Sequence, residues 1–348
     1  MLIKRLHLLL IELGLLEFHI GGSFLHQGLV MLDYFASATF EKPYDLFYIL
    51  IIFFSGYSSD AAALAFLDVE FETRTEFAAK NGIRGDLKIA GTQRIYIVKE
   101  LHKILPNENI VYLGDTGRVP YGSRSRETII KYAMEDINFL KSKDVKMIIA
   151  ACGTVSSTLP KEISDNLGVP YADVVIPSAQ EACALTAHGR IGVVGTSASM
   201  RSNSYGKTIR SIRQDVRVFG NACPLLVHLV ENGLVQPDNQ ITRLTVEMYL
   251  KPLVEEKIDT LILGCTNYPI IYDTFNQLLN YDVTLIDPGK CTARYVKKYL
   301  AANGMLADRE EVGSTDYNVT DQVSGFEQTA SLFLGEPVNG SLNRVELN

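Results

Sequence analysis

Two cysteines stand where apolar, β-branched stretches of the chain end. Residues 146–151 run into Cys152, residues 260–264 run into Cys265, and a threonine and then a helical stretch follow each cysteine. A thiol at a helix N-terminus is expected to have a lowered pKa, because the positive end of the helix dipole favours the thiolate. A single such cysteine is most often a packing residue. A matched pair, one in each half of the chain, favours a shared chemical role.

Two facing thiols suit the inversion of a carbon stereocentre. Inversion needs a base on one face of the carbon and an acid on the other, and one ionised and one protonated thiol supply both. The α-proton of an amino acid is only weakly acidic, so the site must also exclude water and offer donors to the carboxylate. The cysteine pair therefore predicts a proton transfer of the racemase type.

The elements that would position these cysteines alternate between strand and helix. This alternation predicts βαβ units, and hence an α/β fold whose parallel sheets are covered by helices. Ligands of such sheets bind at the carboxyl ends of the strands. The two cysteine motifs accordingly predict two similar parallel-sheet α/β lobes with the active site in the cleft between them. The expected strands are residues 110–113, 145–151, 191–194, 216–219, 260–263 and 283–286, and the expected helices are residues 126–142, 242–256 and 292–301.

Composition indicates a globular protein of more than one domain. The chain has 348 residues, of which 47% are hydrophobic and 21% are charged, enough to bury a sizeable core. The formal charge of −7 disfavours a nucleic-acid partner, since such proteins usually carry a basic surface. The five cysteines form no CxxC pair, which disfavours a disulfide framework or a zinc site and predicts a cytoplasmic location.

Residues 1–85 differ in kind from the rest of the chain. They are rich in Leu, Phe, Ile and Tyr, and their run LFYILIIFF is shorter than the ~20 residues that a membrane-spanning helix needs. The basic and apolar start raises the alternative of a signal peptide, but Glu12 interrupts the apolar stretch. We interpret residues 1–85 as an extra segment, or as the product of a translation start assigned too far upstream, that contributes little to the core.

Five segments in order carry a resemblance to a known family. They are LPNENIVYLGDTGRVPYGSRSRETI, ACGTVSS, GRIGVVGTSASMRSNSYGK, ACPLLVHLVENG and DTLILGCTNYP. From about residue 87 to the C-terminus, the chain resembles the amino-acid racemases that need no cofactor, and most closely the glutamate racemases. The segment GDTGRVPYGS favours glutamate racemases over the aspartate and hydantoin racemases, which carry two thiols on the same fold.

The resemblance implies a role for each matching residue. Cys152 and Cys265 would be the two catalytic thiols, and Glu231 would be the acidic residue that assists one of them. Hydroxyl and backbone donors would hold the substrate carboxylates without bulky charged side chains. The implied substrate-binding residues are Pro120, Tyr121, Gly122, Ser123, Gly153, Thr154, Thr196, Thr266 and Asn267.

The implied activity is the interconversion of L- and D-glutamate, which supplies D-glutamate for peptidoglycan. Glutamate is then the expected partner, neither nucleic acid nor membrane is expected, and a homodimer stays open as the assembly. The sequence has no glycine motif that would bind a nucleotide and no lysine in a context typical of pyridoxal phosphate, so no cofactor is expected. No metal is expected either. The two lobes would comprise residues 87–176 with 288–348, and residues 177–287. The remaining cysteines match no catalytic motif and are expected to pack in the core: Cys183, Cys223 and Cys291.

The chain departs from the family pattern close to the two thiols. Ile89 and Ala90 stand where the family has Asp and Ser, and Asn267 stands where it has His. Gly153 replaces an Asn, and Ile176 replaces a Glu. An Asn side chain can form hydrogen bonds but cannot exchange a proton. The alternative function is therefore a racemase-fold protein of low or no activity that binds an amino acid or a partner.

Overall fold

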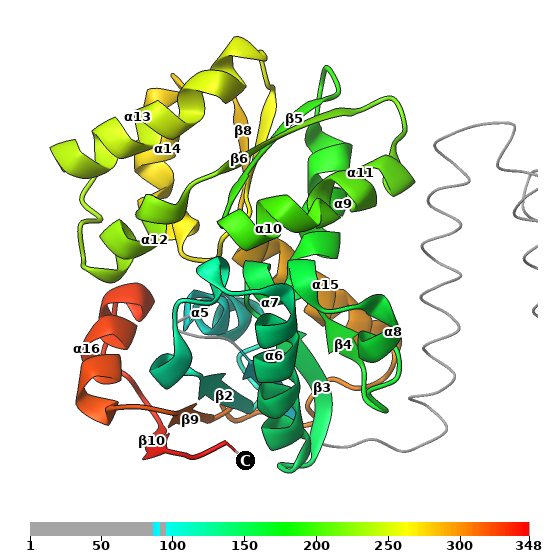
Figure 1. Ribbon diagram of the computed structural model, residues 1–348. Helices are drawn as coiled ribbons and strands as arrows, with labels where there is room; N and C mark the ends of the chain where they lie inside the picture. The colour runs from blue at the N-terminus through cyan, green and yellow to red at the C-terminus, as the bar shows by residue number, and fades with distance from the viewer. Residues whose placement is uncertain (1–85, 91–94, 348) are drawn as a thin grey trace, which may run out of the picture. The chain divides into compact units, whose positions relative to one another are not determined.

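The computed structural model describes residues 86–90, by their backbone alone, and residues 95–347 (Figure 1). The expectations for residues 1–85 lie outside the described residues, and residues 91–94 are likewise not described. Within the described part of the chain, no helix combines the length and the apolar character that a membrane span requires.

The first sheet has six parallel strands in the order β10-β9-β2-β1-β3-β4. β1 pairs on one side with β2 and on the other with β3, so that Ala90 lies beside Leu113 and Ala150. β1 thus begins close to residue 87, from which the chain resembles the racemase family. The strands are β1 (Asp86–Ala90), β2 (Ile110–Gly114), β3 (Val145–Ala150), β4 (Tyr171–Ala172), β9 (Thr315–Val319) and β10 (Ser341–Arg344).

The second sheet has four parallel strands in the order β6-β5-β7-β8. Figure 1 shows α13 and α14 on one side of this sheet and α9 and α11 on the other. Coverage of both faces explains why the central strands are continuous apolar runs rather than alternating ones. The strands are β5 (Arg190–Gly195), β6 (Arg217–Ala222), β7 (Thr260–Leu263) and β8 (Thr284–Ile286).

The helices connect successive strands, and several begin at residues that favour a helix start. The Ser125 side chain caps α6 by accepting a hydrogen bond from the Thr128 N–H, and Asp287 caps α15, whose first residue is a proline. α15 packs against both α5 and α9. The helices are α5 (Ile95–Ile104), α6 (Arg126–Lys141), α7 (Gly153–Thr158), α8 (Lys161–Ser164), α9 (Val175–Leu185), α10 (Ser197–Ser202), α11 (Ser204–Ile212), α12 (Pro224–Glu231), α13 (Gln240–Glu255), α14 (Tyr272–Leu278), α15 (Pro288–Ala302) and α16 (Val323–Leu334), with 3-10 helices η1 (Thr116–Arg118), η2 (Tyr121–Ser123) and η3 (Tyr268–Ile271).

One hydrophobic core cluster joins the two sheets. It includes Tyr112 and Ile149 of the first sheet together with Val194 and Leu263 of the second, all fully buried. Cys265 belongs to the same cluster. The burial of apolar surface, which is the main favourable term in folding, therefore also holds the second cysteine in place.

The predicted α/β fold with parallel sheets is confirmed, and each expected strand and helix is present to within a few residues. Sequence analysis missed β4, β9 and β10. β4 has two residues, and β10 is an edge strand whose residues Ser341, Asn343 and Arg344 are exposed. Such segments lack the continuous apolar run by which the other strands were recognised.

Candidate active site

Cys152 lies just beyond β3 and is the N-cap residue of α7. Its Sγ accepts a hydrogen bond from the backbone N–H of Val155 at 3.4 Å, and only 1% of the residue is exposed. The strand, cysteine and helix therefore follow one another here as the sequence predicts.

Cys265 follows β7 in a different local setting. A turn comes after it, and the 3-10 helix η3 begins only at Tyr268, with Asn267 as its N-cap residue. Pro269 has no N–H to donate to the Cys265 carbonyl, as an α-helix starting here would require. That carbonyl instead accepts a hydrogen bond from the Tyr268 N–H at 2.9 Å. The helix expected after the second cysteine thus begins later and with a tighter turn.

The two cysteine motifs touch each other through their backbones. A Cβ atom placed on Gly153 would lie 2.3 Å from the carbonyl oxygen of Gly264 and 3.7 Å from the Cα of Cys265. The hydroxyl of Thr266 also donates to the carbonyl of Ala151 at 3.0 Å. The carboxyl ends of β3 and β7, which belong to different sheets, therefore meet at the residues that flank the two thiols.

Hydroxyl groups gather next to this contact. The Oγ1 atoms of Thr154 and Thr196 lie 3.0 Å apart, and both residues are buried. Thr196 also caps α10, where its Oγ1 accepts a hydrogen bond from the Ser199 N–H at 3.2 Å. A Cβ atom on Gly122 would lie 2.9 Å from the Cβ of Thr196, so only a glycine lets the loop at 119–123 approach this closely.

A small cavity of about 80 Å³ lies beside these hydroxyls. It brings together the predicted residues of the 119–123 loop with Thr196 and Glu231, whereas neither Cys152 nor Cys265 lines it. Sequence reasoning singled out Glu231 of α12 but not the other residues of this helix that line the cavity, among them His228, which stands one helical turn before Glu231. The cavity is lined by Val119, Pro120, Tyr121, Gly122, Ser123, Thr196, Ser197, Pro224, Val227, His228 and Glu231.

Glu231 and Asn267 connect the cavity with the second cysteine motif. The Nδ2 of Asn267 donates to Glu231 Oε1 at 3.1 Å. Asn267 is 1% exposed, and its Oδ1 has no hydrogen-bond partner among the described residues. A buried acceptor without a donor is costly, so this oxygen is available to a donor from a bound ligand.

The other three cysteines are buried in the hydrophobic core. Cys183 and Cys291 lie in one core cluster and Cys223 in another. Burial raises the pKa of Cys183 to about 11 and that of Cys291 to about 12. Burial also raises the pKa of Cys223, and the nearby thiol of Cys265 raises it further. These thiols are therefore protonated at neutral pH.

Tyr205 of α11 is a neighbour of both candidate thiols that sequence reasoning missed. Its hydroxyl is buried and has no hydrogen-bond partner among the described residues. Burial raises the pKa of its phenol, and the charges of Asp173, Cys265 and Cys152 raise it further. Its ring packs against Gly264, which precedes Cys265: a Cβ on Gly264 would lie 3.0 Å from Tyr205 Cε2. A single tyrosine in a polar segment gave no signal of this.

Besides Gly153 and Asn267, the positions at which the chain departs from the family pattern lie in β1 and α9. Ile89 and Ala90 are in β1, where Ala90 is in register with Ala150 at the end of β3. Their backbone thus leads to the same edge of the sheet as Cys152. Ile176 lies in the first turn of α9 and is 39% exposed, and its N–H donates to Asp173 Oδ1 at 2.8 Å.

Comparison with known proteins agrees with this geometry. A family model described as Asp/Glu/Hydantoin racemase matches residues 96–296. A glutamate racemase of Geobacter metallireducens is 39% identical over 258 residues, which are 74% of this chain and 94% of that protein. The crystal structure of a glutamate racemase isoform from Bacillus anthracis has a TM-score of 0.72 at 33% identity, covering 76% of this chain and 98% of that one. The glutamate racemase of Francisella tularensis subsp. tularensis, in complex with D-glutamate, has a TM-score of 0.70 with the same identity and coverages.

The chain belongs to the Asp/Glu/Hydantoin racemase family. It is an amino-acid racemase, and thus an isomerase, whose similar relatives are glutamate racemases. The resemblance inferred from the five sequence segments is confirmed.

Proposed function

We propose that this racemase interconverts L- and D-glutamate with Cys152 and Cys265 as its acid/base pair. The observation that carries the proposal is the contact between the two cysteine-bearing strand ends. The Thr266 hydroxyl donates to the Ala151 carbonyl at 3.0 Å, and Gly153 lies against Gly264. Cys152 and Cys265, which follow strands of different sheets, are next to the residues of this contact in the chain.

The reaction needs only a proton to move between carbon and sulfur. One thiolate removes the α-proton of the bound amino acid and becomes a thiol, while the opposite thiol donates its proton to the other face and becomes a thiolate. The product has the inverted configuration, and the two sulfurs have exchanged roles. Either enantiomer is a substrate, because the reverse reaction begins from the state that the forward reaction leaves.

Glutamate as the substrate is supported by the relatives and by the donors around the cavity. The relatives that align over most of their length are named glutamate racemases. Ser123, Thr196 and Ser197 bring hydroxyl groups to the cavity, and hydroxyl and backbone donors suit a dicarboxylate. We extend the proposal to Thr154, Thr266, Gly153 and Asn267 as substrate contacts, and to Glu231 as the group that assists Cys265 through Asn267.

The wider role follows from the product. D-glutamate made by this enzyme would supply peptidoglycan synthesis, and a cytoplasmic location accords with that role. The lobe that carries Cys152 would comprise residues 87–176 and 288–348, and the lobe that carries Cys265 would comprise residues 177–287. Each lobe then brings one parallel sheet and one thiol to the site.

A second candidate function is favoured by a specific observation. Asn267 stands where the resemblance expects a His, and its amide donates to Glu231 without being able to exchange a proton. Ile89 and Ala90 likewise replace an acid and a hydroxyl. A racemase-fold protein that binds glutamate and turns it over slowly would have these features.

The test is exchange of the α-proton of glutamate for deuterium in heavy water, together with chiral chromatography of both enantiomers. We expect exchange in the parent protein and its loss in Cys152→Ala and in Cys265→Ala, since each thiol serves one face of the carbon. Cys183→Ala, at a buried cysteine of the core, is the control and should keep its activity.

Two results would decide against the proposal. Exchange that survives Cys152→Ala would contradict the two-thiol mechanism. Measurable glutamate binding by calorimetry, without any exchange in the parent protein, would favour the slow or inactive binder.

A further inference from the structure

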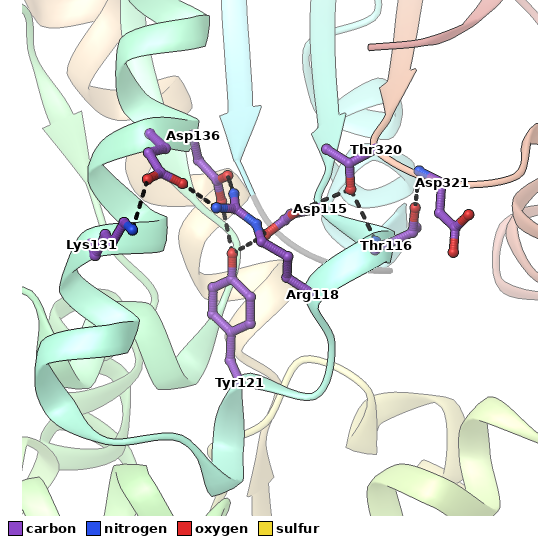
Figure 2. Close-up of polar contacts among 10 residues, drawn as sticks. Asp115, Thr116, Arg118, Tyr121, Lys131, Asp136, Thr320 and Asp321 are labelled. Atoms are coloured by element: carbon purple, nitrogen blue, oxygen red, sulfur yellow. Dashed lines mark hydrogen bonds and ion pairs between the residues drawn. The ribbon is translucent and has the colours of Figure 1, made fainter. Parts of the chain in front are cut away.

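An ionic cluster lies next to the loop that lines the cavity, with Asp115, Tyr121 and Asp136 buried and Arg118 and Glu135 partly exposed (Figure 2). Arg118 is at its centre, with Nε 2.6 Å from Asp115 Oδ2, one terminal nitrogen 3.0 Å from Asp136 Oδ1, and the other in contact with Glu135. The hydroxyl of Tyr121 donates to Asp115 Oδ2 and lies 3.3 Å from Asp136 Oδ2. These five residues are called the Arg118 cluster below.

The cluster has too few hydrogen-bond donors to satisfy the side-chain oxygens of both Asp115 and Asp136 if both were ionised. Asp115 accepts three hydrogen bonds, from Arg118, from Tyr121 and, at 2.8 Å, from the Thr320 hydroxyl. A phenol has a single hydrogen, so Tyr121 cannot donate to Asp115 and Asp136 at once. Among the described residues, Asp136 Oδ2 has no other donor.

A proton on Asp136 completes the arrangement. The carboxylic acid would then donate to the phenolic oxygen of Tyr121, and Tyr121 would donate to Asp115. Asp136 is 2% exposed, and its burial together with the charge of Asp115 raises its pKa well above the usual range. Two buried carboxyl groups near one another do not readily ionise together, since each charge opposes the other.

The Arg118 cluster fixes one end of a tyrosine whose neighbours line the cavity. Tyr121 is the first residue of η2, and it lines the cavity itself together with Gly122 and Ser123. Gly122 lies against Thr196, which opens α10 and also lines the cavity. The phenol is thus held by residues around β2 and α6, while the next residue packs against the second sheet's α10.

The geometry points to a positioning role: Asp115, Arg118 and a protonated Asp136 hold the Tyr121 phenol, and thereby fix the 119–123 loop where substrate is bound. The identity of what the loop binds rests on the proposed function. The anchoring of the loop does not, and it can be measured without any substrate.

The experiment compares three variants by hydrogen–deuterium exchange of the peptide that contains residues 119–125. Asp136→Asn keeps an acceptor for Arg118 and supplies an N–H donor for Tyr121, so it imitates the neutral acid. Asp136→Leu removes both, and Tyr121→Phe removes the phenolic oxygen. We expect Asp136→Leu and Tyr121→Phe to speed exchange in this peptide about tenfold, as the loss of one net hydrogen bond implies, and Asp136→Asn to preserve most of the protection.

Tyr132→Phe is the matched control. The Tyr132 ring lies 5.6 Å from that of Tyr121, and the guanidinium of Arg118 lies 4.2 Å above it. Its hydroxyl makes no hydrogen bond within the Arg118 cluster, so the variant should leave both the exchange and the thermal unfolding temperature unchanged.

Steady-state kinetics tests whether fixing the 119–123 loop matters for substrate binding. With glutamate as substrate, Asp136→Leu and Tyr121→Phe should raise KM about tenfold and change kcat less, because they displace a binding loop rather than a thiol. If Asp136→Asn and Asp136→Leu raised the exchange rate or KM equally, the proposal that a protonated Asp136 holds Tyr121 would be overturned. If Tyr121→Phe left the exchange of this peptide unchanged, the proposal that the Tyr121 phenol fixes the 119–123 loop would be overturned. If the parent protein neither binds nor racemises glutamate, the proposed function fails, while the exchange experiment still decides the anchor.

Discussion

The two cysteine-bearing strand ends are alike in sequence and differ in their surroundings. Cys152 caps α7, and its sulfur accepts a backbone N–H. Cys265 precedes a turn, and the nearby side chain of Asn267 is hydrogen-bonded to Glu231. A backbone N–H of a helix therefore contacts the first thiol, whereas a hydrogen-bonded pair of side chains, Asn267 and Glu231, lies close in sequence to the second. Substitution of Asn267 should consequently affect the second thiol.

What the two ends share is the backbone contact between them. Gly153 and Gly264 have no side chains, and the carbonyl of Gly264 occupies the space that a Cβ of Gly153 would need. A side chain there must push the two strand ends apart, since backbone cannot rotate out of the way as a flexible side chain can. Since the resemblance expects an Asn at this position, the close approach of the two strand ends belongs to this chain, and a side chain at residue 153 should disturb it.

Outside the two cysteines themselves, the largest expected effect is that of Gly153→Ala. The added methyl group would lie 2.3 Å from the Gly264 carbonyl oxygen, and overpacking of this kind costs about 1–3 kcal/mol in the free energy of unfolding. Displacement of the thiols should lower kcat/KM about 100-fold, since an error of ~1 Å in a catalytic group has that effect. Urea denaturation and racemisation assays measure the two quantities.

The matched control is Gly325→Ala, near the start of α16, where a Cβ would meet nothing within 4 Å. Alanine favours a helix over glycine by up to about 1 kcal/mol, so this variant should be neutral or slightly more stable. If Gly153→Ala behaves like Gly325→Ala, the two strand ends are not held as closely as described.

The next effect separates the threonines that follow the two cysteines. Thr266→Val removes the hydrogen bond to the Ala151 carbonyl and should cost about 1–2 kcal/mol in unfolding free energy and about tenfold in kcat/KM. Thr154→Val should cost less, because its partner Thr196 keeps its contacts with Ser199. Equal losses in the two variants would argue against a special role for the contact between the strand ends.

Much of the fold, and the places of the two cysteines, could be predicted from local pattern. Continuous apolar runs identify strands buried on both faces, and the rule that ligands bind at their carboxyl ends directs attention to Cys152 and Cys265. The late start of the helix after Cys265 could also have been read from Pro269.

The contacts between distant segments could not be predicted in this way. Thr266 and Ala151 are 115 residues apart, and Tyr121 meets Asp136 only because α6 packs beside the end of β2. No local period reports such a pairing. An Asp and a Tyr in polar segments are ordinarily surface residues, so the burial of Asp115, Tyr121 and Asp136 could not be predicted from the sequence.

A smaller effect, and in the favourable direction, is expected from Asn267→His. An imidazolium next to Glu231 would stabilise a nearby thiolate and could relay its proton, which the amide of Asn267 cannot do. The racemisation rate should rise several-fold, up to about tenfold. Asn267→Leu is the control, since it fills a similar volume without polar groups, and it should leave the rate at or below that of the parent. A lower rate in Asn267→His than in Asn267→Leu would show that the amide itself is required.

The smallest effect on activity is expected from Cys183, which has neither a strand-end position nor a partner motif. Cys183→Ala should leave racemisation unchanged and cost about 1 kcal/mol in unfolding free energy, as loss of a buried sulfur does. Because burial raises its pKa to about 11, only about one thousandth of the thiol is ionised at pH 8, and the thiolate is the form that reacts with iodoacetamide. Labelling of Cys183 in the native protein should therefore be slow at pH 8 and rise about tenfold per pH unit until the pH approaches 11. Mass spectrometry of the labelled peptides measures this directly. If Cys183 were labelled as fast at pH 8 as an unfolded cysteine, its thiol would be accessible and ionised. Cys183 could then no longer be classed as a packing residue that is distinct from the reactive cysteines.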